Sequence, residues 1–172
     1  ARWSRGLGDV YKRQEVDSDP TQGTTFTIFL PASDQPAAER PARPTQRIRG
    51  NETLLLVDDE EMILKVGTQM LTRLGYTVLT AQTGQAAIDI YHQQMDAIAM
   101  VILDMIMPVM SGRDIFERLR EINPRIKTLL SSGYSIDGQA AEILKRGCNG
   151  FIQKPFTLDA LSQKIREILD AE

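Results

Sequence analysis

Hydrophobic residues in residues 51–172 follow two alternating patterns. Short continuous runs rich in branched residues are typical of strands buried on both faces, as in a parallel sheet. Longer stretches, with hydrophobic residues three or four positions apart, are typical of helices that cover such a sheet. The runs predict strands at residues 53–57, 76–80, 101–104, 127–132 and 150–154. The stretches predict helices near residues 60–74, 83–94 and 111–122, one ending near 146, and a last one after 157.

Five strands that alternate with five helices predict the α/β class, with a doubly wound five-stranded parallel sheet. About 120 residues are enough for one hydrophobic core of this kind. Thr83 and Thr157 precede the second and the last helix, where a hydroxyl can cap the free backbone N–H groups. On the first helix, the residues expected to face the core are Ile63, Val66, Met70, Leu71 and Leu74.

Residues 1–50 do not continue this pattern. Residues 25–30 alternate around β-forming residues and end at Pro31, so they predict one strand. Residues 32–50 are rich in proline, arginine and small polar residues, a composition typical of an extended linker. Residues 9–14 resemble a translated sequencing adapter, so we interpret residues 1–14 as a sequencing or construction scar outside any fold.

The composition is that of an ordinary globular protein. The 172 residues are 42% hydrophobic and 25% charged, with no apolar run of membrane-spanning length and no secretory signal pattern. Cys148 is the single cysteine, so neither a disulfide within the chain nor a cysteine metal cluster is possible. Residues 51–172 carry more acidic than basic side chains, which argues against direct binding to nucleic acid. We therefore expect a cytoplasmic domain that contacts neither membrane nor nucleic acid.

Acidic residues follow two of the predicted strands. Asp58 and Asp59 come directly after residues 53–57, and Asp104 lies within the apolar run that stops at Pro108. The carboxyl ends of parallel strands meet at one edge of the sheet, which is where ligands bind in this class. Three carboxylates held together repel one another unless a cation is present. An oxygen-rich site of this kind suits Mg²⁺.

Two further polar side chains end predicted strands. Ser132 closes the fourth strand, and Lys154 closes the fifth, directly before Pro155. Phe151 lies three residues before that lysine. A hydroxyl and an ammonium group beside carboxylates and a metal ion can bind an anion, most simply a phosphoryl group.

Together these features resemble the receiver domain of the two-component response regulator family, which is CheY-like. The resemblance covers residues 51–172 and implies a (βα)5 flavodoxin-like fold. The residues that carry it occur in the family's order: Asp58-Asp59, Asp104 with Pro108 and Gly112 after it, Ser132-Gly133 and Lys154-Pro155.

The resemblance implies a role for each of these residues. Asp104 is the expected phosphoryl acceptor. Asp59, Asp104 and the backbone carbonyl of Ile106 are expected to bind Mg²⁺ directly, with Asp58 contributing directly or through water. Ser132 and Lys154 are expected to contact the phosphoryl oxygens. Phe151 is expected to be the aromatic residue that rotates when the hydroxyl moves, and Pro155 is the candidate for a cis peptide bond. The family more often has threonine where Ser132 stands and frequently tyrosine at Phe151.

The same resemblance implies a phosphorelay function. The phosphoryl group would come from a histidine kinase or a histidine phosphotransfer protein, and its arrival would switch the surface formed by the fourth helix, fifth strand and fifth helix. Residues 18–31 resemble the closing segment of the ATP-binding domain of sensor histidine kinases, so we interpret residues 15–31 as a remnant of that domain. The parent would then be a hybrid kinase with a C-terminal receiver. This chain lacks the kinase core, so we expect only self-phosphotransfer and slow self-dephosphorylation.

Three alternatives come from other classes. A degenerate receiver would act as an interaction module without phosphorylation, but the complete acidic set argues against it. A hydrolase of the haloacid dehalogenase type places a second acid two residues beyond its nucleophile. This chain has Ile106 at that position and so lacks the general acid, which argues against a phosphatase. A dinucleotide-binding domain would show Gly-x-Gly-x-x-Gly after the first strand, and this pattern is absent.

Overall fold

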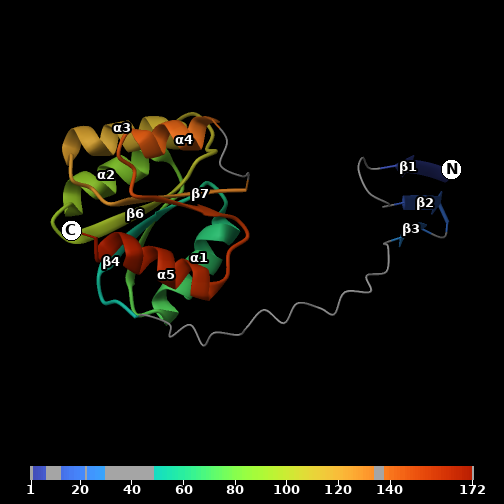
Figure 1. The fold of residues 1–172 in the computed structure, drawn as a ribbon, viewed down its shortest axis with the longest axis horizontal. Coiled ribbons are helices and arrows are strands. Elements are labelled where there is room, and N and C mark those ends of the chain that lie inside the picture. Colours follow the sequence, from blue (N-terminus) through green and yellow to red (C-terminus); the bar gives the residue numbers. More distant parts are fainter. Residues whose placement is uncertain (1, 7–12, 22, 30–48, 134–137, 172) are drawn as a thin grey trace. The chain divides into compact units, whose positions relative to one another are not determined.

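The computed structural model describes residues 2–6, 13–21, 23–29, 49–133 and 138–171. The chain divides into two compact units, Ala1–Arg43 and Pro44–Glu172. Most of the predicted linker, up to residue 48, lies outside the described residues. We describe each unit by itself (Figure 1).

The larger unit contains a five-stranded parallel sheet with strand order β5-β4-β6-β7-β8. This order confirms the predicted doubly wound sheet. The strands are β4 (Thr53–Val57), β5 (Thr77–Ala81), β6 (Ile98–Asp104), β7 (Thr128–Ser132) and β8 (Gly150–Gln153). The helices are α1 (Glu61–Arg73), α2 (Gly84–Gln94), α3 (Gly112–Ile122), α4 (Gly138–Lys145) and α5 (Leu158–Leu169). Of the helices described, none is both long and apolar enough to cross a bilayer.

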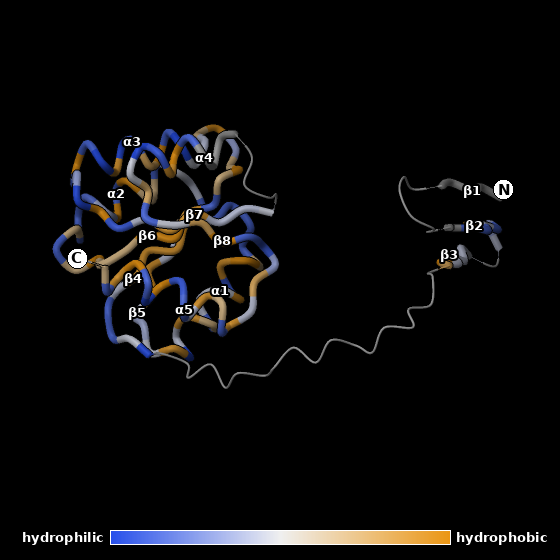
Figure 2. The backbone as a smooth tube through the Cα atoms, viewed as in Figure 1, coloured by the Kyte–Doolittle hydropathy of each residue, from blue (hydrophilic) through white to orange (hydrophobic). Residues whose placement is uncertain are grey.

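Helices cover both faces of this sheet, with α2, α3 and α4 on one side and α1 and α5 on the other (Figure 1). Successive residues of a strand point to opposite faces. In β4, Leu55 and Val57 therefore pack under α2 and α3, whereas Leu54 and Leu56 pack against α1 and α5. The middle of β4 and most of β6 are accordingly hydrophobic, and polar residues stand at the strand ends (Figure 2).

The helix starts carry the expected caps. The hydroxyls of Thr83 and Thr157 accept hydrogen bonds from backbone N–H groups three residues on, so both predicted N-caps are confirmed. Ser111 and Asp114 form a reciprocal capping box at the start of α3. Gly75 adopts a positive φ of 99° after α1, a conformation that favours glycine and lets the chain turn into β5.

One predicted hydrophobic face is partly wrong. Leu71 and Leu74 of α1 are buried as expected, but Val66 is 48% exposed, and Leu64 is buried in its place. The hydrophobic stripe of α1 is wider than the strip of sheet beneath it. Part of the stripe therefore faces solvent, beside the carboxyl edge of the sheet.

The smaller unit is a three-stranded antiparallel sheet formed by β1 (Arg2–Gly6), β2 (Arg13–Asp19) and β3 (Gly23–Phe29). The strand predicted at residues 25–30 corresponds to β3. The expectation that residues 1–14 belong to no fold is not met, because β1 and the start of β2 lie there. Strand β1 pairs antiparallel with the edge of β2, so the backbone N–H and C=O groups along that edge are hydrogen-bonded. The origin of this segment as a scar stays a prediction.

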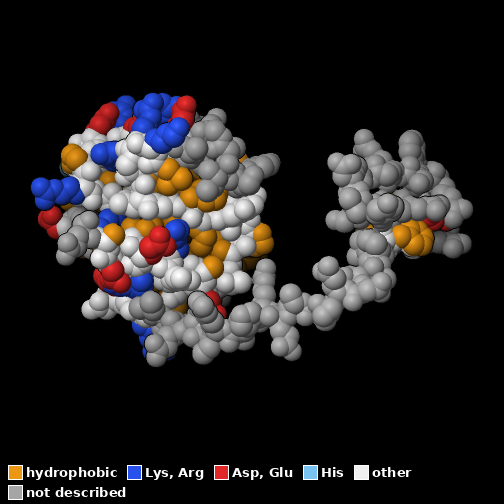
Figure 3. Space-filling model, in the orientation of Figure 1, with side chains coloured by type: hydrophobic (Ala, Val, Ile, Leu, Met, Phe, Trp, Pro, Cys, Tyr) orange, Lys and Arg blue, Asp and Glu red, His pale blue; other side chains and the backbone are white. Residues whose placement is uncertain are grey.

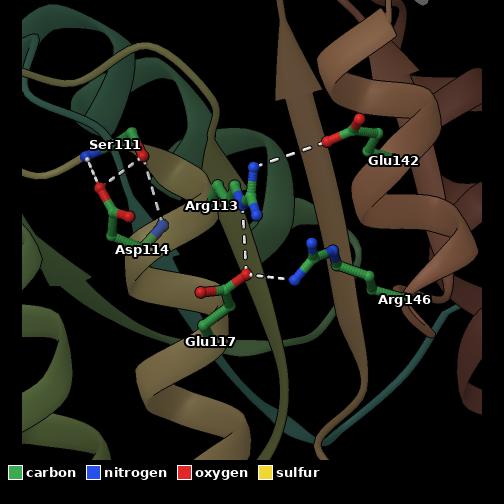
Figure 4. A network of polar contacts seen from close by, with 6 residues as sticks. All are labelled: Ser111, Arg113, Asp114, Glu117, Glu142 and Arg146. Carbon is green, nitrogen blue, oxygen red and sulfur yellow. Dashed lines mark hydrogen bonds and ion pairs between the residues drawn. The ribbon is translucent and has the colours of Figure 1, made fainter.

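A polar network joins α3 to α4 (Figure 4). Arg113 pairs with Glu117 at 3.1 Å and with Glu142 of α4 at 3.5 Å. Glu117 also pairs with Arg146, just after α4, at 2.8 Å. Lys and Arg side chains gather over these helices, with acidic side chains among them (Figure 3). All these side chains are substantially exposed, so they contribute more to the orientation of α4 than to stability.

Candidate functional site

Three strands deliver polar side chains to one edge of the sheet. Asp58 follows β4, Asp104 is the last residue of β6, and Lys154 follows β8. Because the strands are parallel, these positions lie at the same carboxyl edge. Asp58 is 2% exposed and Asp104 is 7% exposed, so both carboxylates are buried where hydrophobic strands end.

Lys154 bridges the two buried carboxylates. Its Nζ donates to Asp58 Oδ2 at 2.6 Å and to Asp104 Oδ1 at 2.7 Å. The lysine side chain is 21% exposed, so one side of it still meets solvent. These three residues are far apart in the sequence, and the structure brings Asp58, Asp104 and Lys154 into direct contact. Asp59, although it is among the described residues, forms no hydrogen bond or ion pair with any of the three.

Burial and the neighbouring charges shift the pKa of both Asp104 and Lys154. Burial raises the pKa of Asp104, and the nearby charge of Asp58 adds to that rise, although the hydrogen bonds from Lys154 and Ile106 act in the opposite direction. Burial alone would lower the pKa of Lys154, but its hydrogen bonds to Asp104 and Asp58 raise that pKa overall. The Lys154 ammonium group therefore stays protonated, and the Asp104 carboxyl group has a pKa above that of an ordinary aspartate.

Backbone N–H groups hold both carboxylates in place. The Glu60 N–H donates to Asp58 Oδ1 at 3.0 Å, at the entry to α1. The Ile106 N–H donates to Asp104 Oδ2 at 3.1 Å. Each carboxylate is thus fixed by the loop that follows its own strand on one oxygen and by Lys154 on the other.

Gly112 allows the loop after β6 to fold back onto Asp104. Its N–H donates to the carbonyl oxygen of Met105 at 3.1 Å. A Cβ at this position would lie 2.5 Å from the carbonyl oxygen of Asp104 and 2.7 Å from the Cα of Met105. Both neighbours are backbone atoms, which cannot move aside without distorting the loop.

We expect Gly112→Ala to destabilise the domain by about 2 kcal/mol, because overpacking against fixed backbone forces the loop to shift. Urea denaturation at neutral pH measures this change. Gly133→Ala is the matched control, since a Cβ there meets nothing within 4 Å. Equal midpoints for the two variants would show that the close approach at Gly112 is not needed.

The other predicted residues lie around this cluster. Ser132 is the last residue of β7 and is buried, and its carbonyl oxygen accepts a hydrogen bond from the Lys154 N–H at 2.7 Å. Phe151 pairs with Leu130 in the sheet and lies half-buried against the core under α2, α3 and α4. The peptide bond between Lys154 and Pro155 is cis.

The donor chemistry at this edge fits a hard divalent cation. Asp58, Asp59 and Asp104 carry three negative charges against one positive charge on Lys154, and carboxylate oxygens are the ligands that Mg²⁺ prefers. Asp59 is exposed at the same strand end. No three acidic, histidine or cysteine side chains of the described ranges stand close enough together to enclose a metal ion. The three carboxylates therefore have the chemistry of magnesium ligands, and the Lys154 ammonium group lies between those of Asp58 and Asp104.

The sequence interpretation missed a groove beside the cluster. It runs between α1 and the segment after β8, and it is lined in part by Ile63, Val66, Met70, Phe156 and Lys154. Its walls are mainly hydrophobic, yet it opens next to the buried acids. The sequence could have indicated this groove, because α1 has more hydrophobic residues than are needed to cover the sheet beneath it.

Comparisons with known proteins agree with this geometry. The family model of the response regulator receiver domain matches residues 54–166. The sensor kinase CckA of Brucella abortus is 34% identical over 165 residues, covering 91% of this chain and 18% of that protein. This chain therefore spans about a fifth of the length of that relative.

Solved structures give the same result. A response regulator receiver domain from Clostridium thermocellum is 30% identical, with a TM-score of 0.67, and the match covers 69% of this chain and 94% of that one. The receiver domain of the sensor histidine kinase PA1611 from Pseudomonas aeruginosa has a TM-score of 0.64 at 23% identity, covering 71% and 100%, which shows the shared fold. The chain belongs to the response regulator receiver family, the receiver domains of two-component phosphorelays.

Proposed function

We propose that Asp104 accepts a phosphoryl group from a phosphohistidine and that Asp58, Asp59, Ser132 and Lys154 assist. The observation that carries the proposal is the bridge from Lys154 to Asp58 and Asp104 at 2.6 and 2.7 Å. It places one nucleophilic carboxylate and one fixed cation side by side at the ligand-binding edge of the sheet. A degenerate interaction module would have no need to keep these buried charges.

The chemistry follows from these positions. An oxygen of Asp104 attacks phosphorus in line, the new P–O bond forms, and the P–N bond to the imidazole breaks. The leaving imidazole takes up a proton. The Lys154 ammonium offsets negative charge on the phosphoryl oxygens, and it needs little reorganisation because it already lies 2.7 Å from Asp104. The hydroxyl of Ser132 would bind a phosphoryl oxygen.

We infer that Asp59, Asp104 and the Ile106 carbonyl hold Mg²⁺, with Asp58 bound directly or through water. The PA1611 receiver carries a magnesium ion in its active-site cleft. When bound, Mg²⁺ supplies charge neutralisation for the transferring group. The excess negative charge at this edge supports the assignment.

We expect Mg²⁺ to raise the thermal midpoint of the domain in a concentration-dependent way, because it binds the folded site and not the unfolded chain. At one hundred times the dissociation constant the gain is about 2.7 kcal/mol. Differential scanning fluorimetry with and without MgCl₂ measures it. Asp58→Asn should reduce the shift, whereas Asp89→Asn, on the exposed side of α2, should not. Equal shifts in all three proteins would argue against metal at this edge.

Phosphorylation would then act as a switch. It adds charge and acceptor oxygens at a fixed point, and Ser132 moves toward them. Phe151, half-buried beside β7, would fill the space that Ser132 leaves. The surface that changes would comprise α4, β8 and α5. The Arg113–Glu142 and Glu117–Arg146 pairs link α3 to the α4 region, so a shift of α4 would remake these contacts.

We infer that the parent protein is a hybrid sensor kinase. The CckA match spans 91% of this chain, so it necessarily includes residues that precede the receiver. This supports the interpretation of residues 15–31 as a kinase remnant. The donor would be a histidine kinase or a histidine phosphotransfer protein. A cytoplasmic location and the absence of nucleic-acid binding stay predictions.

Intact mass spectrometry after incubation with acetyl phosphate tests the proposed function. We expect one added phosphoryl group, dependent on Mg²⁺, lost on treatment with hydroxylamine and absent when EDTA is present. No adduct under conditions where the protein is folded would favour the degenerate interaction module instead.

A further inference from the structure

A second polar cluster lies at the amino edge of the sheet, opposite the edge that carries Asp104. Glu52, directly before β4, pairs with Arg166 of α5 at 2.6 Å between Oε1 and Nη1. Arg166 also pairs with Asp170 at the end of α5. Lys127, directly before β7, donates to two backbone carbonyl oxygens at that end, at 2.7 and 2.8 Å. These contacts fasten the last turn of α5 to the starts of two strands.

The pair between Glu52 and Arg166 is more sheltered than the ion pairs that join α3 to the α4 region. The Arg166 side chain is 15% exposed and the Glu52 side chain is 29% exposed, against at least 42% for each side chain of those other pairs. Water and salt screen a sheltered pair less than an exposed one. The Glu52–Arg166 pair therefore constrains the two elements that it joins.

The chain that enters the domain is anchored beside this pair. The Gly50 N–H donates to the carbonyl oxygen of Leu74 at 3.0 Å, and the Thr77 N–H donates to the carbonyl oxygen of Glu52 at 3.0 Å. A Cβ on Gly50 would overlap the ring of Tyr76, which is buried. The end of the predicted linker is thus held against the turn after α1, with the Glu52 side chain directed to α5.

Helix α5 connects this anchorage with the Asp104 site. Lys154, which binds the Asp104 carboxylate, precedes the helix cap Thr157 by three residues. The twelve helical residues that follow span about 18 Å. Leu161 and Ile165 of this helix are buried in the core, and closely packed elements shift as units rather than deform. A displacement at the start of α5 is therefore transmitted to Arg166 near its end.

Phosphorylation would disturb the Lys154 end of this connection. The Lys154 Nζ now divides its hydrogen bonds between Asp58 and Asp104. Phosphoryl oxygens on Asp104 would offer it new acceptors with more negative charge, and the ammonium group would turn toward them and away from Asp58. Only three residues separate Lys154 from Leu158, the first residue of α5, so the start of the helix would follow.

We propose that the Glu52–Arg166 pair couples phosphorylation of Asp104 to the anchorage of the linker at Gly50, so that the phosphorylated domain holds the linker less firmly. The receiver would then signal to the part of the chain that precedes it. The inference rests on the proposed function, because phosphorylation of Asp104 drives the change. It extends that function from the carboxyl edge of the sheet to the amino edge.

Pulsed hydrogen–deuterium exchange with mass spectrometry tests the coupling on the full 172-residue chain. The protein is incubated with or without acetyl phosphate and MgCl₂, intact mass confirms the adduct, and a short D₂O pulse follows. We expect the Gly50 and Thr77 amides of the phosphorylated wild type to exchange about threefold faster, because their hydrogen bonds open more often. In Arg166→Met, which keeps an unbranched stem but has no N–H groups, exchange should be fast in both states.

Two further variants sharpen the test. Glu52→Ala breaks the same pair and leaves the Arg166–Asp170 pair in place, so phosphorylation should no longer change exchange at Gly50. Lys164→Met is the matched control, since it breaks an exposed pair with Glu167 on the same helix and should respond like the wild type.

Three results would overturn the proposal. The first is a phosphorylated wild type without faster exchange at Gly50. The second is the full wild-type acceleration in both Arg166→Met and Glu52→Ala. The third is its loss in Lys164→Met as well, because the effect would then not belong to this pair. The absence of an adduct on the wild type would instead refute the proposed function, and the inference with it.

Discussion

Asparagine in place of Asp104 is expected to abolish phosphoryl transfer and at the same time to stabilise the domain. The amide has no anionic oxygen to attack phosphorus, so incorporation from acetyl phosphate should fall below detection. The substitution also removes a buried negative charge beside Asp58 while keeping the shape of the side chain. Activity and stability should therefore change in opposite directions, which is common where a site holds charges that the fold alone does not favour.

The sign of the stability change follows from the pKa of Asp104. Burial and the charge of Asp58 raise this pKa above its value in the unfolded chain. A carboxyl group of this kind stabilises the fold when it is protonated, and that contribution is lost as the pH rises through the raised pKa. The wild-type protein loses this stabilising contribution as the pH rises through that pKa, whereas the amide of Asp104→Asn does not titrate and loses nothing.

Urea denaturation at pH 7 and at pH 4 measures the difference. Asp104→Asn should have the higher midpoint at pH 7, and the gap should narrow at pH 4. Asp89→Asn on the exposed side of α2 is the matched control, with little change at either pH. A less stable Asp104→Asn protein at pH 7 would mean that the ion pair with Lys154 outweighs the burial of charge.

Alanine in place of Lys154 is expected to have the second-largest effect. Loss of a fixed positive charge next to the transferring group should slow phosphorylation by acetyl phosphate by about a hundredfold or more. Removal of the cation also leaves Asp58 and Asp104 buried without their common partner. Because Lys154 is one-fifth exposed, we expect a stability loss of about 2 kcal/mol, below the range for fully buried pairs.

The rate of phosphorylation is measured in quenched time courses with acetyl phosphate, and the loss of stability is measured by urea denaturation. Lys164→Ala is the matched control: it breaks an exposed pair with Glu167 at 2.9 Å and should cost at most about 0.5 kcal/mol without slowing phosphorylation. Adding Asp58→Asn to Lys154→Ala should recover part of the lost stability, since one of the two unpaired charges is removed. A Lys154→Ala protein that is phosphorylated at the wild-type rate would contradict the assigned role.

Most of the fold follows from local patterns in the sequence. Residues 54–57 of strand β4 form one uninterrupted apolar run, which only a sheet covered on both faces can bury. Thr83 and Thr157 mark helix starts because a hydroxyl is the natural partner of free N–H groups. The convergence of Asp58, Asp104 and Lys154 follows in turn, since parallel strands end at one edge.

The missed features depend on three-dimensional contacts that the local pattern does not contain. Val66 has the spacing of a core residue, and its exposure depends on how α1 is rotated over the sheet. The positive φ of Val109 is invisible in the sequence, because valine is among the residues least suited to it. The bridge from Lys154 to two carboxylates depends on distances that strand order alone does not give.

The acceptor can be located directly by mass spectrometry. Borohydride reduces an aspartyl phosphate to homoserine, which peptide sequencing identifies by position. After phosphorylation with acetyl phosphate and Mg²⁺, we predict homoserine at position 104 and unmodified aspartate at positions 58 and 59. Homoserine at another position, or a phosphorylated protein with unmodified Asp104, would contradict the account.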